Sequence, residues 1–297
     1  MRIIIFILLF FSLQSQAQII RANPLYRPFA VGSSCSYLLD QYSGAAAAYS
    51  LRKLDCDYTG YAIKVRRSSD NAEQDIGFTA NGDLDTATLK TFVSSNSGYV
   101  TTWYDQSGNT NNATQSTAVS QPKIVTSGVI YREGVRPSLY FDGSNDWFSI
   151  TTAINGNQPF STFYPQRRLS SGGLGMWVST SSGEFPYSPI IYQSFGIYIG
   201  HSTATENAKL STENSVSFIL LSGFATAANT YSIYKNATAL TLTNASASAT
   251  GSFNYIGKRA SNECSYASCP EIILYSSDQS SNRTGIESNI NSYYTIY

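Results

Sequence analysis

The segment Tyr61-Ala62-Ile63-Lys64-Val65-Arg66-Arg67 carries the pattern that decides the fold. Successive side chains of an extended chain point to opposite faces, so Ile63 and Val65 fall on one side and Lys64 and Arg66 on the other. This two-residue period predicts a β-strand with one face in a core and the other face in water.

Similar short segments recur along the chain, and Gly, Asn and Ser separate them. They cover residues 99–104, 123–131, 138–141, 175–179, 190–200, 215–221, 230–234 and 253–256. The composition agrees, because 22 Tyr beside many Ser, Thr, Asn and Gly favour pleated surfaces and tight turns over helices. Many short strands joined by turns predict a β-sandwich.

Two segments depart from this pattern. Residues 282–294 place Ile286, Ile290 and Tyr293 at spacings of four and three, which predicts a C-terminal helix that packs on a sheet. The apolar stretch around Ala45 to Ala48 fits either a helix or a buried strand, because periodicity alone does not separate the two.

The first residues predict export. Arg2 precedes an apolar run from Ile3 to Phe11, and Ser15-Gln16-Ala17 offers small residues before a cut after Ala17. The run is far shorter than the ~20 residues that cross a bilayer, so a membrane anchor is the weaker alternative. We expect a signal peptide over residues 1–17, an N-terminal arm over 18–36 and one sandwich domain over 37–297. The mature protein is expected outside the cytoplasm, extracellular or periplasmic, without membrane insertion.

The charge balance excludes one class of partner. The formal net charge is zero and only 13% of residues are charged, so the chain has no basic surface with which to collect nucleic acid.

The cysteine count predicts disulfides. An exported chain with four cysteines favours two bridges, Cys35 with Cys56 and Cys264 with Cys269. A zinc site is the alternative, but neither pair has the two-residue spacing of zinc ligands and His201 is the only histidine.

One motif resembles a known family. The stretch Trp103-Tyr104-Asp105-Gln106-Ser107-Gly108-Asn109 is similar to a turn in the catalytic domain of the α-L-arabinofuranosidase B family. Ser43-Gly44-Ala45 with Tyr49-Ser50-Leu51-Arg52 resembles another segment of that family, and residues 137–143, 255–257 and 271–275 resemble strands of concanavalin A-like and laminin-G-like sandwiches. The resemblance implies an all-β fold, a two-sheet jelly-roll sandwich with a short C-terminal helix.

The resemblance also implies a pair of catalytic carboxyl groups, which a retaining glycosidase needs ~5 Å apart. The family carries its nucleophile after a Cys-Cys pair, which this chain lacks, and its acid in a late turn that corresponds to residues 257–262, with Ser261 at the acid's position. Serine cannot supply that proton, so Glu263 and Glu184 remain the candidate catalytic residues.

Binding a sugar needs an aromatic platform and polar partners for the hydroxyl groups. The candidate ligand-binding residues are Trp103, Tyr104, Asp105, Asn109, Asp142, Asn145, Asp146, Trp147 and Trp177, with Asn111 as a further polar partner. Each Trp has a core position as its alternative role. For Asp105, turn chemistry favours a structural role, since an Asp before Ser-Gly-Asn can accept backbone N–H groups.

The loop Asp142-Gly143-Ser144-Asn145-Asp146 is a candidate site for one cofactor, a calcium ion. Its oxygen spacing suits calcium, although it lacks the closing Glu of an EF-hand loop. No other cofactor is expected.

Three functions follow from these observations. The first is a secreted carbohydrate-recognition domain that resembles the α-L-arabinofuranosidase B catalytic domain and binds plant-type or surface glycans. The second is an active retaining glycoside hydrolase that releases terminal arabinofuranose from arabinan or arabinoxylan. The third is a surface or tail adhesion module with a protein ligand.

Overall fold

The computed structural model describes residues 35–180, 190–192, 196–198, 216–227, 230–242, 251–259 and 263–297. Residues 36–297 group into one compact unit. The predicted signal peptide, and the predicted arm up to residue 34, lie outside the described residues. Within the described part of the chain, no helix is both long enough and apolar enough to cross a membrane.

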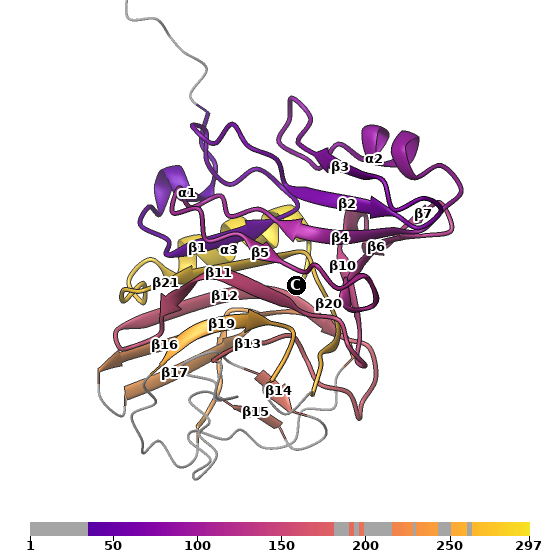
Figure 1. The fold of residues 1–297 in the computed structure, drawn as a ribbon. Coiled ribbons are helices and arrows are strands. Elements are labelled where there is room, and N and C mark those ends of the chain that lie inside the picture. The colour runs from indigo at the N-terminus through magenta and orange to yellow at the C-terminus, as the bar shows by residue number, and fades with distance from the viewer. Residues whose placement is uncertain are drawn as a thin grey trace, which may run out of the picture. The chain divides into compact units, whose positions relative to one another are not determined.

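The first sheet of this unit, sheet I, contains long strands from the second half of the chain (Figure 1). Every neighbouring pair in it is antiparallel. Its strands, in spatial order, are β1 (Ala47–Ser50), β21 (Glu271–Tyr275), β12 (Phe160–Arg168), β16 (Phe218–Ala227), β17 (Thr230–Lys235) and β18 (Thr238–Ala239).

The second sheet, sheet II, is also antiparallel throughout. Its strands, in spatial order, are β3 (Glu73–Ile76), β2 (Ile63–Arg67), β4 (Gly98–Trp103), β5 (Ala113–Thr114), β11 (Phe148–Asn155), β19 (Ser252–Ile256) and β13 (Val178–Thr180).

A short chain of strands connects the two sheets at one side. Strand β6 (Lys123–Thr126) pairs with β4 and with β10 (Leu139–Asp142), and β10 pairs with β20 (Tyr266–Cys269), which reaches β12 of sheet I. The remaining small strands form hairpin pairings: β7 (Val129–Ile130) with β6, β8 (Arg132–Glu133) with β9 (Arg136–Pro137), and β14 (Ile190–Tyr192) with β15 (Gly196–Tyr198). The predicted all-β sandwich is therefore confirmed.

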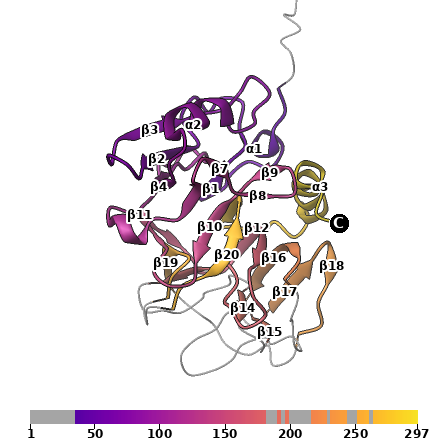
Figure 2. The same ribbon diagram turned by 90° about the vertical axis from the view of Figure 1, so that its right-hand side faces the viewer.

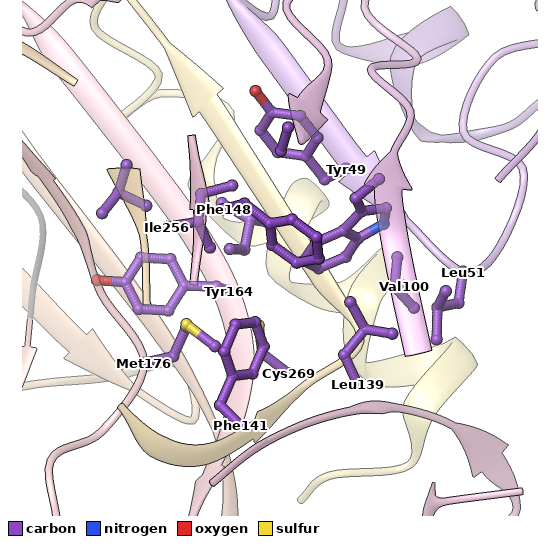
Figure 3. Packing of buried hydrophobic residues seen from close by; sticks show 14 of the residues in the cluster. Tyr49, Leu51, Val100, Leu139, Phe141, Phe148, Tyr164, Met176, Ile256 and Cys269 are labelled. Atoms are coloured by element: carbon purple, nitrogen blue, oxygen red, sulfur yellow. The ribbon is translucent and has the colours of Figure 1, made fainter. Parts of the chain in front are cut away.

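The main core lies between the sheets. Figure 3 shows Tyr49 of sheet I and Phe148 of sheet II among its buried side chains, together with Tyr164 and Ile256. Aromatic rings meet across the layer, and the centroids of Phe160 and Phe253 lie 4.7 Å apart.

Strand β2 has the predicted alternation. Ile63 and Val65 are fully buried in the main core, whereas Lys64 and Arg66 are only partly buried. The hydrophobic effect thus fixes the register of this strand, because a shift by one residue would turn both apolar side chains outward.

Sheet I is buried on both faces. Ile272 and Leu274 of β21 belong to the main core, but Ile273 and Tyr275 point to a second apolar cluster. The helix α3 (Arg283–Tyr294) covers that outer face (Figure 2). This double burial explains why β21 is apolar almost throughout instead of alternating.

The predicted C-terminal helix is therefore confirmed. Its buried stripe contains Ile286, Ile290 and Tyr294, while Tyr293 is only partly buried. The undecided stretch around Ala45 contributes Ala47 and Ala48 to strand β1.

Several elements differ from the expectation. Two helices, α1 (Leu38–Gln41) and α2 (Thr86–Val93), and a 3-10 turn, η1 (Ala118–Ser120), were not predicted. Segments 123–131 and 190–200 each contribute an antiparallel strand pair instead of a single strand, and a turn at 127–128 interrupts the first of them.

The long strand β12 was also missed because Pro165 interrupts its sequence pattern. Proline cannot donate to a strand ladder, so it argues against a central strand. In the structure β21 pairs with Ser161 to Phe163 and β20 pairs with Arg167 and Arg168. Pro165 falls in the gap between these two pairings, where its missing N–H does no harm.

Only one of the two predicted disulfides forms. Cys35 and Cys56 are disulfide-bonded, whereas Cys264 and Cys269 are buried thiols, so the second predicted bridge was wrong. The chain from 264 to 269 is extended and ends in β20. Five residues of strand span ~16 Å and place the two ends on opposite faces, far beyond disulfide reach.

Candidate functional site

The Trp103–Asn109 motif is a structural turn. Asp105 is 4% exposed, and its carboxylate accepts the N–H groups of Ala48, Ser107 and Asn111 at 2.8–2.9 Å and the hydroxyl of Ser107 at 2.8 Å. This carboxylate therefore joins the turn to strand β1, and both of its oxygens accept hydrogen bonds from the protein.

The neighbours of Asp105 are held in the same way. The Asn109 amide donates to the carbonyl of Ala45 at 2.9 Å, and the Asn111 amide donates to the carbonyl of Ala46 at 2.9 Å. Trp103 is fully buried, with its ring 5.7 Å from that of Tyr49. Tyr104 donates its hydroxyl to Asp75 at 2.6 Å.

The other two tryptophans are also engaged. Trp177 is fully buried in the core. Trp147 is half-buried and borders an open polar groove of about 410 Å³ that Lys64, Thr102 and Gln115 also line. The ammonium of Lys258 lies 3.9 Å from the centroid of the Trp147 ring, so a cation covers one of the faces that a sugar would use.

A different pocket brings distant carboxylates together. Strands β10 and β20 pair Asp142 with Tyr266, and the N–H of Gly143 donates to the carbonyl of Ser265 at 3.0 Å. The N–H of Tyr266 in turn donates to the carbonyl of Leu174 at 2.9 Å. These bonds enclose a pocket of about 370 Å³, here called the acidic pocket, lined by Asp142, Gly143, Gly172, Gly173, Glu263 and Tyr266.

Glycines allow this pocket to form. A Cβ at Gly143 would lie 2.8 Å from the Cβ of Tyr266, and one at Gly173 would lie 3.1 Å from the same atom. Both backbone segments therefore pack directly on Tyr266. At Gly172, by contrast, a Cβ would meet no atom within 4 Å, so this position faces open space.

Charge in the acidic pocket comes from Asp142 and Glu263. The carboxylate of Glu263 pairs with the guanidinium of Arg259 at 2.9 Å, and its side chain remains 31% exposed.

Cys264 also lines the pocket, and burial, together with the charge of Asp142, raises the pKa of its thiol to about 11. The thiol therefore stays protonated at neutral pH and is no nucleophile.

The loop from Asp142 to Asp146 forms one edge of this pocket. Asp142 accepts the N–H groups of Ser144 and Asn145 at 2.8 and 3.1 Å, and Asp146 accepts the N–H of Asp142 at 3.0 Å. Asn145 is exposed at the tip of the turn. Hydrogen bonds within the loop thus engage one carboxylate oxygen of Asp142 and one of Asp146.

Asp146 has an unusual environment for a carboxyl group. It is 3% exposed, and burial, reinforced by the negative charge of Asp142, raises its pKa from 3.8 to about 7. The hydrogen bond from the N–H of Asp142 and the charge of Lys123 oppose this rise. A buried carboxyl that changes its charge near pH 7 thus lies next to the acidic pocket.

This environment predicts a pH-dependent stability. Between pH 3.8 and about 7 the unfolded chain releases the Asp146 proton while the folded chain retains it, so the free energy of unfolding falls as pH rises and levels off above pH 7. The full loss is at most about 4 kcal/mol. We expect Asp146→Asn to remove this loss and to be more stable than wild type at pH 8, but not at pH 4, in urea unfolding.

Asp278→Asn provides the control, because Asp278 is exposed and accepts a backbone N–H in a similar turn. This variant should retain the wild-type pH profile. A parallel profile for Asp146→Asn and wild type between pH 4 and 8 would contradict the assignment.

The predicted catalytic pair is only partly described. Glu263 lines the acidic pocket, whereas Glu184 lies outside the described residues, as do Ser261 and His201. The sequence analysis missed Gly143, Gly172, Gly173 and Tyr266 as pocket residues. Gly143 and Gly173 were the local signals, because at both positions the backbone approaches Tyr266 closely.

Among the described residues, one group of three possible metal ligands comes together, formed by Cys35, Asp40 and Cys56. Both of its cysteines are disulfide-bonded, so they cannot act as thiolate ligands.

Comparisons with known proteins agree with this architecture. The family model described as "Alpha-L-arabinofuranosidase B, catalytic" matches residues 37–131. A search of curated protein sequences found no match. Among solved structures, an arabinofuranosidase complexed with arabinofuranosyl-α-1,2-xylobiose is 13% identical with a TM-score of 0.58. A GH54 α-L-arabinofuranosidase soaked with a cyclic sulfate inhibitor is 14% identical, with a TM-score of 0.58.

Each of these structural matches covers 86% of this chain. The chain spans 64% and 65% of the length of the two proteins. The chain therefore has the β-sandwich fold of these arabinofuranosidases, and its residues 37–131 resemble the catalytic domain of the α-L-arabinofuranosidase B family.

Proposed function

We propose that this chain is an exported carbohydrate-recognition domain that binds a neutral glycan in the acidic pocket, with terminal arabinofuranose as the favoured sugar. The observation that carries the proposal is the meeting of Tyr266, Asp142 and Glu263 in one open pocket. The disulfide of Cys35 and Cys56 supports export, because such bonds persist in oxidising compartments.

The chemistry of the pocket suits a sugar. Ionised carboxylates accept hydrogen bonds from hydroxyl groups, and these charge-assisted bonds are stronger than neutral ones. The tyrosine ring offers an apolar surface for C–H groups. Arg259 already pairs with Glu263, but the carboxylate of Asp142 would repel an acidic sugar, which favours a neutral one.

The position of the pocket also supports arabinofuranose. The family resemblance implies a catalytic acid in the turn at residues 257–262, directly after β19 (Ser252–Ile256). Glu263 follows this turn and lines the pocket. The carboxylates Asp142 and Glu263 lie outside the residues that the family model matches, so the choice of arabinofuranose rests on the position of this turn.

Filling the pocket is the sharpest test. Gly172→Leu adds a side chain in open space at the pocket wall, and we expect it to weaken binding of an arabino-oligosaccharide at least tenfold without lowering the melting temperature. Calorimetric titration of the full chain with arabinotriose measures this. Unchanged affinity in Gly172→Leu, or no binding by wild type, would overturn the proposal.

A charge test accompanies it. Glu263→Gln removes a charged acceptor, which lowers affinity about tenfold. The matched control is Glu73→Gln, because Glu73 is exposed and lines the polar groove instead. Equal effects of the two variants would contradict a role for Glu263.

Hydrolysis is a second candidate, favoured by the presence of two carboxyl groups, Asp142 and Glu263, in one pocket. Release of 4-nitrophenol from 4-nitrophenyl α-L-arabinofuranoside separates the two functions. The recognition proposal predicts no release above the uncatalysed rate. Release that Glu263→Gln abolishes would replace recognition with catalysis.

A further inference from the structure

A second pocket lies on other loops and carries different chemistry. It holds about 430 Å³ and forms where the segment before β2 meets the segment after β3. Its lining includes Tyr37, Lys53, Tyr58, Tyr61, Gly77 and Phe78, and we call it the aromatic pocket. None of its residues lines the acidic pocket.

The aromatic rings of this pocket differ in how far they are exposed to solvent. Phe78 is partly buried and packs on the main core, and the ring of Tyr58 meets it edge-on at 6.3 Å. Tyr61 is 51% exposed, with its ring 6.3 Å from that of Tyr104. The pocket thus presents a large exposed ring on a rigid base.

Hydrogen bonds hold these rings in place. The hydroxyl of Tyr58 donates to the carbonyl of Tyr61 at 2.8 Å, which fixes the loop that carries both residues. Burial, together with the charge of Asp105, raises the pKa of Tyr58 to about 12, so this hydroxyl keeps its proton. A preformed platform reduces the ordering cost of binding.

The charge of the aromatic pocket is opposite to that of the acidic pocket. Lys53 is the only lining residue with a formal charge, and all lining residues belong to the described part of the chain. Its ammonium donates to the carbonyl of Cys56 at 3.1 Å and lies 5.9 Å from the ring of Tyr37. An ammonium has three N–H donors, so the bond to the Cys56 carbonyl leaves two of them for a ligand carboxylate.

We propose that the aromatic pocket is a second carbohydrate site, which binds a sugar ring that carries a carboxylate, a uronic acid. The exposed face of Tyr61 receives the C–H face of the ring, and Lys53 receives the carboxylate. Thr59 and Thr79 line the same pocket and offer hydroxyl groups to the sugar hydroxyls. The chain then recognises a neutral and an acidic sugar at two separate points.

The test uses two ligands that share one sugar backbone and differ only at their carboxyl groups, which are ionised in one and methyl-esterified in the other. We expect the full chain to bind trigalacturonate at least fivefold more tightly than its methyl ester, as measured by calorimetric titration. Lys53→Met should remove this difference. Lys90→Met is the control, because Lys90 is an exposed cation on α2 outside the pocket, and it should leave the difference unchanged.

Shape is tested separately. Tyr61→Ala should weaken both ligands about tenfold. Gly77→Val should do the same, because a Cβ there meets only Tyr61 at 3.5 Å, an ordinary contact, and the larger side chain narrows the pocket. Melting temperatures of both variants show that the fold is retained.

The two pockets provide mutual controls. Gly172→Leu should leave trigalacturonate binding unchanged, and Gly77→Val should leave arabinotriose binding unchanged, so the failure of one proposal is distinguishable from the failure of the other. The inference is overturned if wild type binds both uronides equally or neither of them. It is also overturned if a proline-rich peptide, the other ligand class that aromatic grooves take, displaces the probe and binds more tightly.

Discussion

Replacing Glu271 with alanine is expected to lower the free energy of unfolding by about 3–5 kcal/mol, the largest loss of stability expected for any of these substitutions. Glu271 is fully buried and holds Arg52 through two contacts, at 2.7 and 2.9 Å. It also accepts the hydroxyls of Ser50 and Tyr294. Its removal leaves a buried guanidinium without its counter-charge, which costs far more than the lost contacts alone.

Urea unfolding at pH 7 measures this loss, and a surface ion pair provides the control. Arg67 and Asp70 approach to 2.6 Å, but their side chains are 28% and 47% exposed. Asp70→Ala should therefore cost far less than Glu271→Ala, because solvent screens an exposed ion pair. Similar losses for Glu271→Ala and Asp70→Ala would show that burial does not determine the strength of these pairs.

Asp105→Ala is expected to have the second-largest effect, a loss of roughly 3–4 kcal/mol in the free energy of unfolding. The substitution leaves the buried N–H of Ala48 and the partly buried N–H groups of Ser107 and Asn111 without their acceptor. Asp105→Asn keeps one oxygen and should lose less. The measurement is again urea unfolding, with circular dichroism to confirm that the sheets remain.

The control for Asp105 is Asp142→Ala, in which a partly exposed turn loses the acceptor of two N–H groups that water can reach. This variant should cost about 1 kcal/mol. A loss below 1 kcal/mol for Asp105→Ala, combined with weakened arabinotriose binding, would contradict the structural role of the motif.

Local chemistry explains why parts of the fold were predictable. The alternation of Ile63 and Val65 with charged residues fixed β2, because one face of sheet II is wet. The turn chemistry of Asp105 also pointed to its structural role. The spacing of Ile286 and Ile290 identified α3, since both contact the outer face of sheet I.

Other features depend on contacts that no local pattern contains. Pro165 concealed β12, because a proline fits inside this strand only where neither β20 nor β21 pairs with it, and the sequence does not show that gap. Helix α2 begins at the cap Asp85, whose carboxylate accepts the N–H of Thr88, and this short signal was overlooked. Residues an odd number of positions apart on an extended strand point to opposite faces, so this spacing would have excluded a bridge between Cys264 and Cys269.

The acidic pocket was the least predictable feature. Asp142, Gly172 and Tyr266 come from three distant segments, and the register of β10 with β20 brings two of them together. That register depends on the packing of the whole sandwich. The sequence pointed to Glu263 and Asp142 individually as site residues, but not to their common pocket.

The most direct test of the glycan-recognition account is to map amide chemical shifts of the full chain during titration with arabinotriose. We predict that the largest changes fall on Gly143, Gly172, Gly173 and Tyr266, and that Gly172→Leu abolishes them. Changes centred on Trp147 and Gln115 of the polar groove, or no changes at saturating ligand, would contradict the account.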